Sequence, residues 1–114
     1  MALAAYAAPF QGGPSADEFA RADFGSPPVN YASAIRGHLN QTLFDPFSAH
    51  IEIGKPEKGW YGTTGGLAVP RDIRFGWRVP VRVNAKNRYG GYVGWRKYFF
   101  TFREEQLVNS YEVP

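Results

Sequence analysis

The sequence predicts an α+β protein, a two-layer sandwich in which one main N-terminal helix packs on a roughly four-stranded antiparallel meander sheet. The stretch from Arg74 to Phe102 indicates two long strands joined by a glycine-containing loop, and its first part, Arg74 to Ala85, alternates in polarity with the period of two that is typical of strands. A stripe of apolar residues at i+4 spacing from Tyr31 to Leu43 is typical of an amphipathic helix. The chain also contains 13 glycines and 9 prolines, which favour turns over long helices.

Length and composition restrict the possible classes of protein. A chain of 114 residues indicates one domain. We expect residues 1–25 to be flexible or weakly structured and residues 26–114 to form the single domain. The absence of cysteine excludes disulfides, thiolate metal ligands and cysteine catalysis. No apolar run approaches the roughly 20 residues that a spanning helix needs, so no membrane span is predicted.

The N-terminal segment has one feature of an export signal. Ala5-Tyr6-Ala7 has the small-x-small pattern of a signal-peptidase site, while the basic and long apolar regions that precede such a site are missing. We therefore expect a secreted protein that has lost its signal peptide, located in the periplasm or cell envelope. The alternative is a plain flexible tail. Residues 15–25 are expected to hold a short helical turn.

The main helix is expected to begin at Ser26-Pro27-Pro28, because serine caps helices and proline is tolerated in the first turn. Its buried stripe is formed by Tyr31, Ile35, Leu39 and Leu43. Asp45-Pro46 is expected to end it, because proline disfavours the helical conformation in the preceding residue.

The first strand is predicted at Ser48–Ile53, followed by a long turn-rich connection over Gly54–Pro70 with, at most, a short irregular strand near Trp60. Two long strands follow, from Arg74 to Ala85 and from Tyr92 to Arg103. A tight turn at Glu104-Glu105-Gln106 then leads to a last strand over Leu107–Val113.

The first long strand has an apolar face, including Trp77 and Val81, and a basic face with Arg78 and Arg82. Pro80 lacks an N–H, so we expect a sheet edge or a bulge beside it. The second long strand carries aromatics on both faces and is expected to be central. Residues 84–91, rich in asparagine and glycine, predict a hairpin connection with a bulge, which could also display side chains for recognition.

Charge is unevenly distributed. The segment from Arg71 to Arg103 contains nine basic residues and one acid, a net charge of +8, whereas the rest contains four basic residues and nine acids, a net charge of −5. This asymmetry indicates either an anionic partner or internal pairing between the two parts. The candidate partner-binding residues are Arg74, Arg78, Arg82, Lys86, Arg88, Tyr89 and Arg96.

The sequence offers few residues for catalysis. His38 and His50 are the only histidines and do not have metal-ligand spacing. The serines lack a nucleophile-elbow context, and Gly62–Gly66 lacks the lysine and following helix of a phosphate loop. We expect no enzyme activity, no cofactor and no metal site.

Two motifs occur together: Asp45-Pro46-Phe47-Ser48-Ala49, and the run from Asn84 to Gly94, Asn-Ala-Lys-Asn-Arg-Tyr-Gly-Gly-Tyr-Val-Gly. This pair resembles a group of small, mostly uncharacterised exported proteins and lipoproteins of proteobacteria, over roughly Ile35–Leu107. The resemblance implies an envelope location, without an activity or catalytic residues to carry over. Members often have a lipobox cysteine, which is missing here, so lipidation of these residues is not indicated.

These observations together predict a non-enzymatic, envelope-associated binding or structural module. It would contact a protein or an anionic envelope component through a basic-aromatic sheet face and loop. The alternative is a basic module for single-stranded nucleic acid, which uses cations beside exposed aromatic rings.

Overall fold

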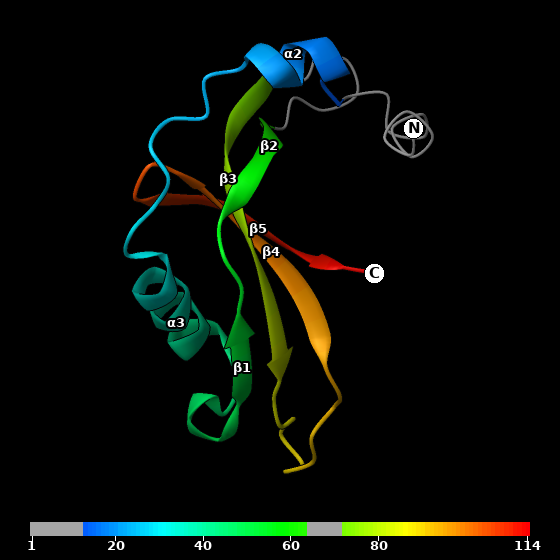
Figure 1. Cartoon of the computed structure of the whole chain (residues 1–114). Coiled ribbons are helices and arrows are strands. Elements are labelled where there is room, and N and C mark those ends of the chain that lie inside the picture. Colours follow the sequence, from blue (N-terminus) through cyan, green and yellow to red (C-terminus); the bar gives the residue numbers. More distant parts are fainter. Residues whose placement is uncertain (1–12, 64–71) are drawn as a thin grey trace.

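The structure is a computed structural model that describes residues 13–63 and 72–114. It has the predicted α+β class: the main helix, α3 (Tyr31–Thr42), lies against one face of a five-stranded antiparallel sheet (Figure 1). A short helix, α2 (Ala16–Arg21), precedes it, and a 3-10 turn, η1 (Pro46–Ser48), follows it. The strands are β1 (His50–Ile53), β2 (Glu57–Thr63), β3 (Asp72–Asn84), β4 (Arg96–Arg103) and β5 (Gln106–Val113).

Strand β3 pairs with three of the other four strands of the sheet. Its first half pairs with β2 and its second half with β1, while β4 pairs along its other side and β5 pairs with β4. Strands β2 to β5 therefore follow the predicted meander, and β1 and β2 lie end to end along one side of β3.

The irregularity expected at Pro80 lies opposite this residue, where β1 ends and β2 has not yet begun. Ile53 pairs with Val81 and Glu57 with Arg78, so the three residues 54–56 lie opposite only residues 79 and 80. Gly54 donates its N–H to the carbonyl of Pro80 at 2.8 Å. A Cβ at Gly54 would lie 2.7 Å from Cγ of Pro80, so glycine permits this close approach.

Strand β2 is the main addition to the predicted fold. Its seven residues replace the irregular segment expected near Trp60, and the sheet has five strands rather than about four. The local sequence of β2 has weak strand propensity, with glycine at positions 59 and 62. Its conformation depends instead on pairing with β3, in which Trp60 lies opposite Phe75. Residues 64–71, at the end of the predicted connection, lie outside the described residues.

Strand β4 begins four residues later than predicted. Tyr92 forms only an isolated bridge with Lys86, and Gly94 has a φ of 97°, which interrupts the extended conformation. Residues 92–95 therefore belong to the connection between β3 and β4. The strand is central, as expected, because β3 and β5 lie on either side of it.

The alternation predicted for β3 is confirmed by burial. Its odd-numbered residues from Val79 to Val83 are buried beneath α3, while Arg78 and Arg82 point to the other face. Since burying one such side chain contributes about 1.5–3 kcal/mol, this cluster contributes strongly to stability. The buried core consists of Ile35, Leu39, Val79, Val81, Val83, Phe100 and Phe102.

A second, aromatic cluster lies at the other end of the sheet. Helix α2 is capped by Ser15 in a capping box. The buried Phe24 contacts Phe75 edge-to-face, with 5.5 Å between ring centroids. Trp77 donates its indole N–H to the carbonyl of Gly25 at 2.9 Å. Part of the N-terminal segment 1–25 thus packs on the sheet, and residues 1–12 lie outside the described residues.

Both ends of the main helix differ from the prediction. The helix begins at Tyr31 rather than at Ser26, and its N-cap residue, Asn30, makes no side-chain capping bond. The carboxylate of Glu105 instead accepts the N–H groups of Val29 and Asn30 at 2.8 and 3.0 Å. Figure 1 shows the β4–β5 turn reaching the segment before α3. The helix ends at Thr42, before Asp45, because Leu43 already has an extended conformation.

Replacing Glu105 with alanine is expected to lower the free energy of unfolding by about 1 kcal/mol, because two charge-assisted hydrogen bonds at an exposed helix start are lost. Urea denaturation of both proteins measures the effect. The control is Glu104→Ala, which removes the neighbouring carboxylate of the same turn and should leave stability almost unchanged. Equal losses for both variants would contradict a specific role for Glu105.

Candidate functional site

The sheet face opposite α3 carries a row of arginines from β3. Arg74, Arg78 and Arg82 project from this face, called the open face, because they alternate with the buried residues of the strand. Their side chains are 58%, 37% and 49% exposed, so the open face presents charged groups to solvent. The sequence prediction that these residues share one face is confirmed.

Each of these arginines has a carboxylate partner in the chain. Glu57 lies directly opposite Arg78, and Glu52 directly opposite Arg82. The distances between the paired atoms are 2.9 Å for Arg74–Asp72, 3.2 Å for Arg78–Glu57 and 2.6 Å for Arg82–Glu52. The hydrogen bond to Asp72 raises the pKa of Arg74 above its usual value. Of the two alternatives left open by the sequence, internal pairing is therefore present, but the pairs remain exposed.

Two of the arginines also lie over aromatic rings. The guanidinium of Arg78 is 4.1 Å from the ring centroid of Phe99, and that of Arg82 is 4.5 Å from the ring of Trp95. Such cation–π contacts contribute roughly 0.5–1 kcal/mol at exposed sites. Each guanidinium is thus held by both a ring and a carboxylate, which restricts its orientation before any ligand arrives.

Further residues of β4 and β5 extend this arrangement. Lys97 lies 5.0 Å from the ring centroid of Phe99, and the ring of Tyr111 lies 5.8 Å from the same ring. At the β1 end, the rings of His50 and Trp95 are 6.4 Å apart. We call this set of residues the cation–aromatic face; it consists of Arg78, Arg82, Trp95, Lys97, Phe99 and Tyr111.

The other predicted site residues lie elsewhere. Lys86 follows the end of β3, and its ammonium lies 5.4 Å from the ring centroid of Tyr92. Arg88 and Tyr89 occupy the centre of the exposed turn between β3 and β4, closed by a hydrogen bond from the N–H of Gly90. This turn, in which Gly90 has a φ of 84°, is the hairpin connection that the sequence predicted.

Arg96 projects on the side of α3, away from the other arginines. It pairs across the sheet with the buried Val83 and contacts the carboxylate of Glu112 at 3.5 Å. The structure therefore divides the predicted site among the open face, the turn and the helix side of the sheet.

Sequence reasoning missed three aromatic members of the cation–aromatic face: Trp95, Phe99 and Tyr111. A partial signal exists, because residues 95, 97 and 99 share one side of the predicted strand while Phe100 and Phe102 alternate with them. Their position beside the arginines depends on the β3–β4 and β4–β5 register, which no local pattern specifies.

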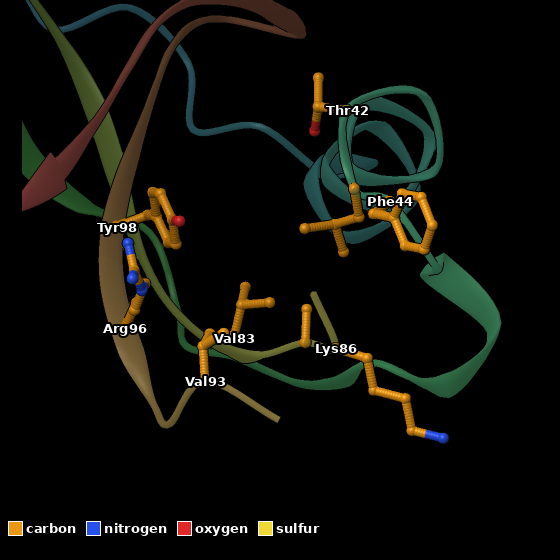
Figure 2. Close-up of a pocket in the computed structure, with 9 residues that line it drawn as sticks. Thr42, Phe44, Val83, Lys86, Val93, Arg96 and Tyr98 are labelled. Atoms are coloured by element: carbon orange, nitrogen blue, oxygen red, sulfur yellow. The ribbon is translucent and has the colours of Figure 1, made fainter. Parts of the chain in front are cut away.

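A cavity of about 250 Å³ opens on the opposite side, at the end of α3. Figure 2 shows Phe44 from the helix end on one side and Val83, Val93 and Tyr98 on the other. Partial burial, followed by the nearby carboxylate of Glu112, raises the pKa of Tyr98. Lys86 extends its ammonium away from the middle of this cavity (Figure 2).

The histidines contact aromatic rings. His38 lies edge-on to Phe100 with 5.5 Å between ring centroids, and His50 is 5.1 Å from Tyr92. Within residues 13–63 and 72–114, no three histidine, aspartate or glutamate side chains come together as metal ligands. Comparisons with known protein families, curated proteins and solved structures find no match to this chain.

Proposed function

We propose that the protein is a non-enzymatic binding module whose cation–aromatic face engages a protein partner. The observation that carries this proposal is the pair of exposed guanidiniums held over rings, Arg78 on Phe99 and Arg82 on Trp95. Arginine, tryptophan and tyrosine dominate the binding energy of protein interfaces, because they combine large contact area with directed hydrogen bonds. Trp95 and Tyr111 remain 44% and 46% exposed and thus offer apolar area to a partner.

The charge balance of the cation–aromatic face favours a protein over a polyanion as its partner. Glu57 and Glu52 neutralise Arg78 and Arg82 at close range, so a phosphate backbone would meet a carboxylate beside each guanidinium. Nucleic-acid binding depends on cations that neutralise phosphates and release counterions. A protein surface of mixed charge can instead pair with both signs at once.

The proposed compartment is the periplasm or cell envelope, supported by the two sequence motifs and by the small-x-small pattern near the N-terminus. Fractionation of cells that produce the protein tests this location. Recovery of the protein from the cytosol alone would contradict it.

The test of the binding face is a pull-down from envelope and cytosolic extracts, followed by affinity measurement with the purified partner. Trp95→Ala combined with Arg82→Gln is expected to weaken binding about 30-fold or more, because each residue has the character of a hot spot. The matched control is Arg96→Gln, which removes an exposed, ion-paired arginine from the other side of the sheet. It should bind like the native protein.

Two results would contradict the proposal. Loss of all captured material after nuclease treatment, with a steep fall in affinity as salt rises, would indicate a single-stranded nucleic-acid module. Equal capture by the native protein and the double variant would show that this face is ordinary solvated surface.

A further inference from the structure

One end of the molecule displays an unusual number of exposed aromatic side chains. Phe47 is fully exposed, and Phe44 and Tyr89 are 71% and 88% exposed. We call this end the tip and define it as residues 43–49 and 85–94. Single exposed apolar residues are common, but a cluster of them marks a surface that contacts an apolar phase or a partner.

The sheet brings the two segments of the tip together. His50 at the start of β1 pairs with Asn84 at the end of β3, so both segments emerge at the same end of the sheet (Figure 1). The hydroxyl of Tyr92 donates to the carbonyl of Ser48 at 2.8 Å and joins the segments directly. The exposed rings therefore belong to one linked surface.

The charge around the tip is positive. Residues 85–94 contain two basic side chains and no acid, and residues 43–49 contain one acid, Asp45, which gives a net charge of +1. The basic residues are Lys86 and Arg88. Of these, Arg88 lies at the centre of the turn beside the exposed Tyr89, so a cation and an aromatic ring project from the same point.

The backbone of the turn satisfies many of its own hydrogen bonds. The side-chain oxygen of Asn87 accepts the N–H groups of Tyr89 and Gly91, at 2.9 and 3.3 Å. Asn84 accepts the N–H of Gly94, and Ala85 that of Val93, both at 3.1 Å. These amides can leave bulk water without losing their partners, which removes much of the usual cost of transferring a loop to a less polar medium.

We propose that the tip docks on an anionic membrane surface, with Phe44, Phe47 and Tyr89 in the headgroup region and Lys86 and Arg88 against lipid phosphates. Aromatic side chains and cations are the groups that stabilise peripheral proteins at this interface. Phe44 and Phe47 come from one segment of the tip and Tyr89 from the other, so both segments offer an exposed ring to a lipid surface. This site is separate from the cation–aromatic face, so either proposal can fail without the other.

Co-sedimentation with lipid vesicles tests the proposal. The probes are vesicles of phosphatidylcholine alone and vesicles of phosphatidylcholine mixed with phosphatidylglycerol in equal amounts. The native protein is expected to sediment with the anionic vesicles and only weakly with the neutral ones. Lys86→Gln with Arg88→Gln should lower the partition coefficient about 25-fold, since each basic residue near the surface contributes about fivefold. Phe47→Ser with Tyr89→Ser should lower it at least about tenfold.

Val29→Ser is the matched control, because Val29 is 76% exposed and lies before α3, outside the tip. It should bind anionic vesicles like the native protein, as should Trp95→Ala with Arg82→Gln. Circular dichroism checks that each variant is folded. Equal binding of the native protein to both kinds of vesicle, or unchanged binding by both tip variants, would overturn the proposal.

Discussion

Replacing Gly76 with alanine is expected to lower the free energy of unfolding by about 3 kcal/mol, because β3 and β4 approach each other too closely there for a side chain. A Cβ at this position would collide with the backbone carbonyl oxygen of Phe102. The colliding atom belongs to the main chain of the central strand β4, so it cannot rotate away as a side chain would. The strands must separate, which disturbs the packing of the buried Phe102.

Urea denaturation measures this effect, with Gly37→Ala as the control. Gly37 lies within α3, and a Cβ there meets no atom within 4 Å. The same chemical change should therefore stabilise the protein by about 0.5–1 kcal/mol, because alanine favours helices over glycine. If Gly76→Ala unfolds at the native urea concentration, the strands can separate without cost and this account is wrong.

Replacing Phe100 with alanine is expected to cost about 4 kcal/mol, within the range measured for phenylalanine truncations in protein cores. Its side chain is 1% exposed and packs in the cluster between the sheet and α3. The cavity that it leaves is bordered by β-branched side chains of β3, which have few alternative rotamers with which to fill it. Such a loss is a large part of the total stability of a small domain.

The adjacent Phe99 provides the control, since it projects from the same strand to the open face. Phe99→Ala should cost only about 1 kcal/mol, because its ring is partly exposed and contacts mainly cations and Tyr111. The same variant should weaken partner binding through the cation–aromatic face. Equal losses of stability for Phe99→Ala and Phe100→Ala would contradict the separation of the two faces.

The elements with strong local patterns were predictable from the sequence. Alternation in β3 identified both its buried face and its arginine row, and the i+4 stripe identified Ile35 and Leu39 as core residues. The turn at Arg88 and Tyr89 was predictable because glycine adopts the positive φ that such turns require. These features depend on residues within a few positions of one another.

Non-local features were missed. Strand β2 has little strand propensity and depends on pairing with β3, and the start of α3 depends on Glu105, which lies 75 residues beyond Asn30 in the chain. The carboxylates opposite Arg78 and Arg82 also come from separate strands. The site therefore could be predicted as an arginine row but not as a set of guanidiniums held by rings and acids.

The interruption between β1 and β2 also affects how the protein resists aggregation. That edge of the sheet is divided by residues 54–56, and Pro56 lacks an N–H with which to pair to an incoming strand. Within the described residues, β5 forms the opposite edge, with eight residues that have a neighbour on one side only. Growth of a fibre by edge-to-edge pairing requires two competent edges on every molecule. Because the β1–β2 edge is interrupted, edge-to-edge pairing at β5 favours a dimer over a growing fibre.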